Sequence, residues 1–251
     1  MNQRDSWQSN AGFILAAVGS AVGLGNLWGF AYSASQGGGA AFALLYVFFV
    51  VLIGLPVLTV EMVIGRRTQK SPIPAMVAVA GRGWAWLGGM FVLAGFGILS
   101  FYSVIMGWTG RMLIDLPFGA VPLDTAAYFG HISTGLGAIV AHLVGMALIV
   151  VIITAGVQKG IERVSVVLMP VLFVLIVGLA LWAATLSGGG PGYAFYLHPD
   201  LSKVFHRETI TGAAGQAFFS LSLGMGAIIT YASYLRGKGS LPFEASAIAL
   251  W

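Results

Sequence analysis

The 55 residues from Ser6 to Val60 contain no charged side chain, and this run constrains the fold more than any other feature of the chain. A charge-free apolar stretch of about 18 residues or more indicates a helix that spans a lipid bilayer. The whole chain agrees, because 58% of its 251 residues are hydrophobic and 8% are charged, against about 25% charged in soluble domains. We therefore predict an all-α polytopic membrane protein. The net charge of +4 lies in short loops and does not indicate a nucleic-acid partner.

Charge-free intervals divide the chain into six predicted spans within a single transmembrane domain. They are residues 10–35, 41–65, 84–112, 134–157, 164–186 and 209–235. Of the 12 Lys and Arg residues, only Arg111, Lys203 and Arg207 lie on the side opposite the N-terminus. Because Lys and Arg are enriched in cytoplasmic loops, both termini of this chain are predicted to be cytoplasmic.

The first and sixth predicted spans are interrupted in the middle. Gly19–Asn26 (GSAVGLGN) carries three glycines and an amide, and Phe218–Ala227 (FFSLSLGMGA) carries two hydroxyls and two glycines. A helix that breaks inside lipid must use its freed backbone groups, because the bilayer offers them no partner. Taken alone, either segment also fits close helix packing or a serine bonded to its own backbone. Two such segments in corresponding positions are typical of a transporter binding site.

No pattern of residues indicates an enzyme. The chain has no Cys, no paired carboxylates and no Ser/His/Asp arrangement, and the lone His142 within the fourth span is typical of a packed residue. Glu61 is the acidic residue deep within a span, where a carboxylate is costly. It is either a proton or ion relay, or a structural anchor for backbone N–H groups freed at the break of the sixth span.

Several segments together resemble the neurotransmitter:sodium symporter family, over nearly the whole chain. They are Gly19–Trp28, Ile53–Pro56, Glu61, Gly65–Arg66, Lys159–Glu162 and Gly215–Tyr234. The resemblance implies a LeuT-type fold with broken first and sixth helices, of which this chain would hold one five-helix repeat and the first helix of the next. Because family members normally have eleven or twelve helices, the chain is expected to be an N-terminal fragment that does not transport alone.

The resemblance also implies ligands for two co-transported sodium ions. The first site would use the Ala21 carbonyl, the Asn26 side-chain oxygen and Ser220, and the second the carbonyls of Gly19 and Val22. All of these are oxygen ligands, which a hard cation prefers. The remaining ligands of both sites are expected on helices that follow this chain.

The substrate site is implied at the same two breaks. Carbonyls and a hydroxyl would meet the substrate amine, and N–H groups at the start of the outer half-helix would meet its carboxylate, since the helix dipole favours an anion there. The residues are, for the amine, Ala21, Phe219, Ser220 and Ser222; for the carboxylate, Leu24, Gly25 and Tyr102; and for the side chain, Ile98 and Met225.

Gly23 bears on the class of substrate. Amine-transporting relatives carry an acidic residue at this position, which supplies the charge that an amine lacks. Glycine leaves the substrate's own carboxylate to complete the first sodium site and so favours an amino acid. The apolar pocket with the adaptable Met225 favours a neutral hydrophobic or aromatic one. The predicted function is therefore sodium-coupled amino-acid symport across the plasma membrane by alternating access.

The gate positions match the family only in part. Gly29 stands where the family has its outer-gate arginine, which removes one half of an extracellular ion pair. The inner-gate positions that match are Arg4, Trp7, Ser233 and Tyr234. Chloride is a further candidate ion through Tyr46, Gln216 and Ser220, although the deciding residue would follow this chain. Two alternatives stay open: a non-transporting half-protein that acts only with a partner chain, and a channel.

Overall fold

The computed structural model describes residues 5–119, 124–235 and 240–250, and all of its regular elements are helices. Within these ranges, four helical stretches are long and apolar enough to cross a membrane, and they fall on the second to fifth predicted spans. They are Ala40–Thr68, Arg82–Phe118, Gly135–Thr154 and Val157–Ala184. The prediction of an all-helical membrane fold is therefore confirmed.

Three of the four long stretches contain short segments of 3-10 or π-helix beside their α-helices. The second span joins α3 (Ala40–Phe49), the π-helical η1 (Val50–Gly54) and α4 (Leu55–Thr68). The third joins η2 (Arg82–Trp84), α6 (Ala85–Asp115) and η3 (Leu116–Phe118). The fourth is α8 (Gly135–Thr154), and the fifth joins the π-helical η4 (Val157–Glu162) to α9 (Arg163–Ala184).

The first and sixth spans are broken helices, as the resemblance implied. The first consists of α1 (Asn10–Ala21) and α2 (Leu24–Gln36), which are bent by 53° against each other. The sixth consists of α11 (Arg207–Ser220) and α12 (Ala227–Ala232), and neither half is long enough to cross a bilayer alone. Six residues therefore separate the halves of the sixth helix, against two in the first.

Short helices also occupy connections that the sequence prediction left without structure. They are α5 (Pro72–Ala80), α7 (Thr125–Ser133), α10 (Gly189–Leu197), η5 (Leu201–Lys203) and α13 (Leu241–Leu250). Local signals account for two of them. Pro72 occupies the first turn of α5, where a missing N–H costs nothing. The Asp124 side chain accepts a hydrogen bond from the Ala127 N–H at 3.0 Å and caps α7.

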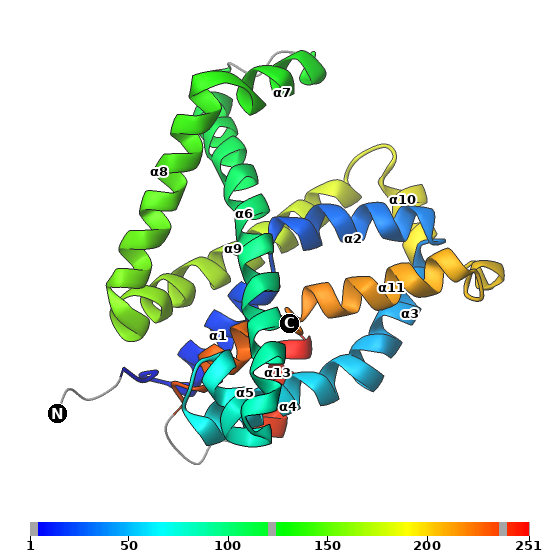
Figure 1. The fold of residues 1–251 in the computed structure, drawn as a ribbon. Helices are drawn as coiled ribbons and strands as arrows, with labels where there is room; N and C mark the ends of the chain where they lie inside the picture. Colours follow the sequence, from blue (N-terminus) through cyan, green and yellow to red (C-terminus); the bar gives the residue numbers. More distant parts are fainter. Residues whose placement is uncertain (1–4, 120–123, 236–239, 251) are drawn as a thin grey trace.

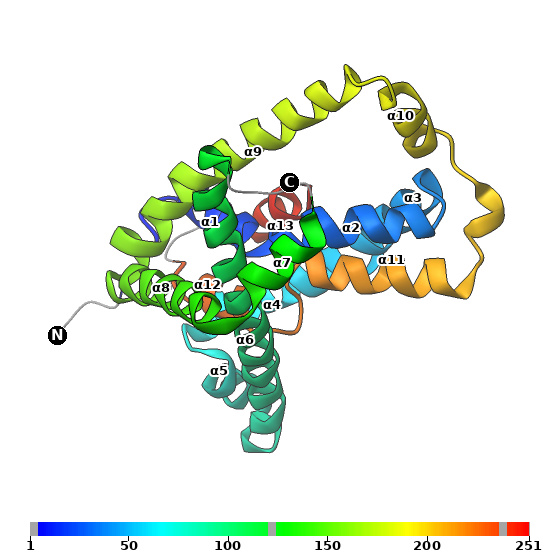
Figure 2. The same ribbon diagram turned by 90° about the horizontal axis from the view of Figure 1, so that it is seen from above.

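The core lies where the broken helices meet α4 and α13. Phe13, Leu58, Met62 and Ile228 are fully buried there. A smaller cluster, which contains Ala34, Phe42 and Ala213, joins α2, α3 and α11. Figures 1 and 2 show α2 and α11 side by side, and Figure 2 shows α9 along the outside. None of the apolar window of Val157–Ala184 is buried within this chain, so this helix presents its apolar side chains to lipid or to further protein.

A glycine brings the second and sixth helices into backbone contact. Gly65 of α4 lies against α12 so closely that a Cβ there would overlap the Ile229 carbonyl oxygen and come within 2.9 Å of the Ala232 Cβ. Small residues allow this approach, and van der Waals packing at such contacts is a principal source of helix association in lipid.

We predict that Gly65→Ala destabilises the chain by about 1–3 kcal/mol, because backbone atoms cannot move aside as a flexible side chain can. Gly89→Ala is the matched control, since a Cβ at Gly89 of α6 would meet nothing within 4 Å. The measurement is the thermal unfolding midpoint of both variants in detergent. Equal midpoints for the two variants would contradict the close contact.

Candidate functional site

The break in the first helix exposes backbone groups on both of its sides. α1 ends at Ala21, Val22 and Gly23 are extended, and α2 begins at Leu24. The Gly23 carbonyl accepts the first hydrogen bonds of α2, from the N–H groups of Asn26 and Leu27 at 3.0 and 3.2 Å. The N–H groups of Leu24 and Gly25, which were predicted to meet a carboxylate, therefore have no acceptor inside their own helix.

The predicted ligands of the first sodium site lie together across the two breaks. The Asn26 side-chain oxygen accepts from the Ser220 hydroxyl at 2.9 Å, and the Asn26 amide nitrogen contacts the Ala21 carbonyl. Gln216, which the sequence assigned only to a chloride site, donates to Asn26 at 3.0 Å and to Ser220 at 3.2 Å. Four residues from the first and sixth helices thus form one polar cluster inside the predicted spans.

A third hydrogen bond joins the first and sixth helices at their breaks. The Ser222 hydroxyl donates to the Ser20 carbonyl at 2.9 Å. Ser222 has φ of 53° and is one of two described non-glycine residues with positive φ, a conformation that is uncommon for residues with a side chain. The hydroxyl that was predicted to meet the substrate amine therefore bonds to a carbonyl of the first helix.

Glu61 meets the backbone of the sixth-helix break. Its side chain is 5% exposed, and one oxygen accepts from the Gly224 N–H at 2.8 Å. Within the described residues its other oxygen has no hydrogen-bond partner. This contact has the geometry expected for the structural anchor, the second of the two roles predicted for this residue.

A cavity of about 700 Å³ adjoins the cluster on the side of α2 and α6. It brings together Gly25, Ile98, Tyr102 and Phe219 of the predicted substrate site. Met225 is not among its lining residues within the described part of the chain, and its carbonyl instead faces Gly95 of α6. A Cβ at Gly25 would overlap the Tyr102 hydroxyl and approach the Phe219 ring to 2.9 Å.

Four aromatic residues that line this cavity were not assigned to the substrate site by the sequence analysis, namely Trp28, Phe101, Trp108 and Phe129. Trp108 of α6 and Phe129 of α7 both line it, with their ring centroids 5.3 Å apart. The Tyr128 hydroxyl holds α7 in place by donating to the Asp115 carboxylate at 2.9 Å. Desolvation, and then this hydrogen bond, raise the pKa of Tyr128, so its phenol stays protonated as the donor. α7 therefore forms part of the cavity wall.

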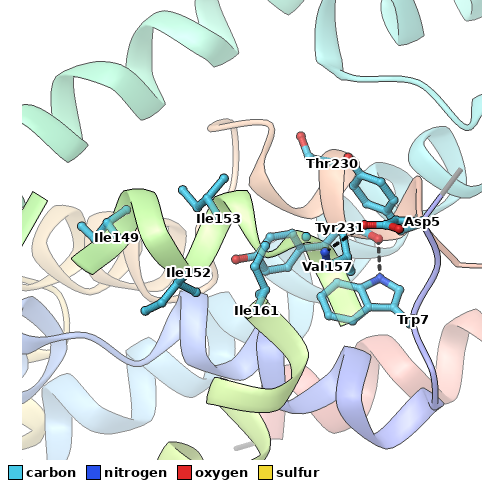
Figure 3. A pocket seen from close by; sticks show the side chains of 11 residues that line it. Asp5, Trp7, Ile149, Ile152, Ile153, Val157, Ile161, Thr230 and Tyr231 are labelled. Atoms are coloured by element: carbon cyan, nitrogen blue, oxygen red, sulfur yellow. Dashed lines mark hydrogen bonds between the residues drawn. The ribbon is translucent and has the colours of Figure 1, made fainter. Parts of the chain in front are cut away.

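At the other end of the first helix, Trp7 joins the N-terminal segment to α12. Its indole N–H donates to the Tyr231 carbonyl at 2.8 Å, and its backbone N–H donates to the Tyr234 carbonyl at 3.3 Å. Figure 3 shows Trp7 beside a second cavity of about 700 Å³, whose far wall is formed by isoleucines of α8. Ser233 is fully buried and donates to the Thr230 carbonyl. Arg4 lies outside the described residues.

Two carboxylates tie this N-terminal segment to the start of the fifth helix in both directions. Asp5 accepts from the Val157 N–H at 3.2 Å, at the beginning of η4 (Figure 3). Glu162, which is 4% exposed, accepts from the N–H groups of Gln8 and Ser9 at 2.7 and 3.2 Å. Asp5 therefore caps the start of η4, and Glu162 caps the start of α1. A negative charge at a helix start is favoured by the helix dipole.

Comparison with known proteins shows the family. The model of the sodium:neurotransmitter symporter family matches residues 4–119 and 128–250. The chain therefore belongs to the sodium:neurotransmitter symporter family, a family of transporters and not of enzymes, which confirms the resemblance drawn from the sequence.

Individual relatives resemble the chain over almost all of its length but only part of theirs. An uncharacterised sodium-dependent transporter of Methanocaldococcus jannaschii is 40% identical over 99% of this chain and 53% of its own sequence. One of Bacillus subtilis is 42% identical over 97% of this chain and 55% of its own. The crystal structure of MhsT in complex with L-phenylalanine superposes with a TM-score of 0.90 at 43% identity, over 98% of this chain and 57% of that one. The chain thus spans about half the length of these relatives.

We predict that Gly25→Ala closes the cavity or expels Tyr102 from it, because the new methyl group overlaps the Tyr102 hydroxyl and the Phe219 ring. Gly23→Ala is the control, since a Cβ there would lie 3.5 Å from the Tyr102 ring, an ordinary contact. The expected result is a loss of about 1–3 kcal/mol in unfolding free energy for Gly25→Ala only, measured by thermal unfolding in detergent. A Gly25→Ala variant as stable as Gly23→Ala would contradict the close contact of Gly25 with the Tyr102 and Phe219 side chains.

We also predict that Glu162→Ala frees the start of α1, since it removes the acceptor for Gln8 and Ser9 at a cost of about 1 kcal/mol. Hydrogen–deuterium exchange over residues 5–12 should become faster. Glu208→Ala, which removes a first-turn acid of α11, is the control and should leave this segment unchanged. Unaltered exchange in Glu162→Ala would remove Glu162 as the anchor of the N-terminal segment.

Proposed function

We propose that this chain is the N-terminal part of a sodium-coupled amino-acid symporter of the plasma membrane, with both termini of the chain cytoplasmic. The observation that supports this most is the polar cluster, in which Ala21, Asn26 and Ser220 lie together. It gathers three uncharged oxygen groups from two broken helices at the middle of their spans. Neutral oxygen ligands suit a monovalent hard cation. The rest of the site would come from the C-terminal part of the transporter or from a partner chain.

The energetic role proposed for the ion follows from gradients across the membrane. A sodium ion that enters down a tenfold concentration gradient supplies about 1.4 kcal/mol, and a potential of about 100 mV adds about 2.3 kcal/mol. Because the cluster lies beside the cavity of Tyr102 and Phe219, an ion there would be adjacent to a bound substrate. Binding of one would then favour binding of the other, which is the coupling that a symporter requires.

The proposed substrate is a neutral amino acid with a hydrophobic or aromatic side chain. Gly23 leaves room for the substrate carboxylate, and the N–H groups at the start of α2 offer it hydrogen bonds. Ile98, Trp108 and Phe219 give the cavity apolar walls. The matched structure of MhsT holds L-phenylalanine, which agrees with such a pocket. Chloride dependence stays a prediction of the sequence resemblance.

The experiment joins this chain to the part of the Bacillus subtilis relative that follows its matched region. Uptake of labelled phenylalanine is then measured in proteoliposomes with and without an inward sodium gradient. We expect uptake only with sodium, and we expect competition by phenylalanine but not by phenethylamine, which has the same ring without the carboxylate. Asn26→Ala should raise the sodium concentration needed by at least about tenfold, the equivalent of about 1.4 kcal/mol of ligand binding.

Asn10→Ala is the control variant, because it removes the same amide from an exposed position at the start of α1. Flux that does not depend on the sodium gradient would favour a channel. Sodium-driven uptake by the 251-residue chain alone would show that its half of the site is sufficient. Unchanged sodium dependence in Asn26→Ala would remove Asn26 from the ion site.

A further inference from the structure

A separate cavity lies between α4 and α5, at the end of the second span. It has a volume of about 410 Å³ and belongs neither to the cluster at the helix breaks nor to the two larger cavities. Its lining consists of four apolar residues and two polar ones. The lining residues are Val63, Ile64, Ala78, Val79, Arg67 and Thr68. The cavity is therefore amphipathic, with its polar residues at the end of α4.

The polar end of this cavity carries uncompensated positive charge. Arg67 is exposed, and among the described residues it forms no ion pair or hydrogen bond. The Thr68 hydroxyl already donates to the Ile64 carbonyl at 2.8 Å, so the Arg67 guanidinium is the side-chain donor available to a ligand. Lys70 and Arg82 add positive charge along the same connector. This charge favours an anionic ligand at this end.

Exposed apolar and tryptophan side chains at the apolar end of the cavity are typical of a membrane–water boundary. Val63 and Val79 are 42% and 52% exposed, although both side chains are hydrophobic. The next segment of the chain carries Trp84 and Trp86, whose rings are stacked 6.4 Å apart and are 48% and 62% exposed. Tryptophan is enriched where the hydrocarbon of a bilayer meets its headgroups. A molecule in this cavity would contact lipid tails at one end and water at the other.

We propose that this cavity binds an anionic glycerophospholipid of the cytoplasmic leaflet. The phosphate would lie against the Arg67 guanidinium, whose planar donors suit a phosphate. One acyl chain would leave along Val63, Ile64 and Val79. The proposal rests on charge complementarity, because the positive-inside distribution places this connector against the leaflet that carries anionic lipids. It does not depend on the transported substrate.

The test uses the full 251-residue chain in detergent, titrated with dioleoyl-phosphatidylglycerol and followed by native mass spectrometry. Dioleoyl-phosphatidylcholine, with the same acyl chains, and inorganic phosphate are the comparison ligands. We expect phosphatidylglycerol to bind more tightly than phosphatidylcholine, and inorganic phosphate not to displace it. Arg67→Gln should weaken phosphatidylglycerol binding about fivefold, which corresponds to about 1 kcal/mol for one basic residue near an anionic surface.

Two further variants separate a defined site from a diffuse basic surface. Arg82→Gln removes the same charge from the same connector but does not line the cavity, so it should weaken binding less than Arg67→Gln does. Ala78→Phe fills the apolar floor without altering charge and should weaken binding even if Arg67→Gln fails to fold. Equal losses in Arg67→Gln and Arg82→Gln would overturn the proposal. So would equal affinity for both lipids, displacement by inorganic phosphate, or occupation of the groove by a second copy of the chain.

Discussion

The lack of water inside a bilayer governs where this chain places its few polar side chains. A broken helix in lipid leaves N–H and C=O groups that cost several kcal/mol each unless the protein itself provides partners. Glu61 accepts the Gly224 N–H, and the Ser222 hydroxyl donates to the Ser20 carbonyl. Each of these bonds connects a break to a different helix. The breaks are therefore stabilised by their neighbours, and the polar groups needed for stability lie close to those proposed to hold an ion.

Close backbone contact supplies the cohesion that hydrophobic burial gives to soluble proteins. Gly65 brings α4 onto α12, and Gly107 brings α6 onto α8, where a Cβ would lie 2.7 Å from the His142 backbone nitrogen. Because lipid tails are as apolar as leucine, helices associate in a membrane through such fits rather than through exclusion of water. This agrees with a core around Phe13 and Met62, whereas α9 packs against α1 but has no buried residue among those described.

The parts of the fold that the sequence predicted depend on local signals. Long charge-free intervals marked four spans, and the glycines between Gly19 and Asn26 marked the first break. The short helices α7 and α13 were missed because their apolar character is not distinctive over nine or ten residues. Glu162 was noted only as part of a motif, since its bonds to Gln8 and Ser9 join positions more than 150 residues apart. Met225 was expected in the pocket by resemblance, but the turn after Ser222 carries its backbone toward Gly95.

Because of the 53° bend in the first helix, its two halves pack against different helices. α1 packs against α9, η4 and α13, whereas α2 packs against α3 and α11. Val22 and Gly23 connect the two halves along the chain, and the contact between the Asn26 amide and the Ala21 carbonyl links them across the break. A rotation at this hinge would move one half-helix as a rigid body relative to the other, while the hydrogen bonds inside each half stay intact. The polar cluster of Ala21, Asn26, Gln216 and Ser220 lies at this hinge, so a small angular change there would alter its size before either helix had to unwind.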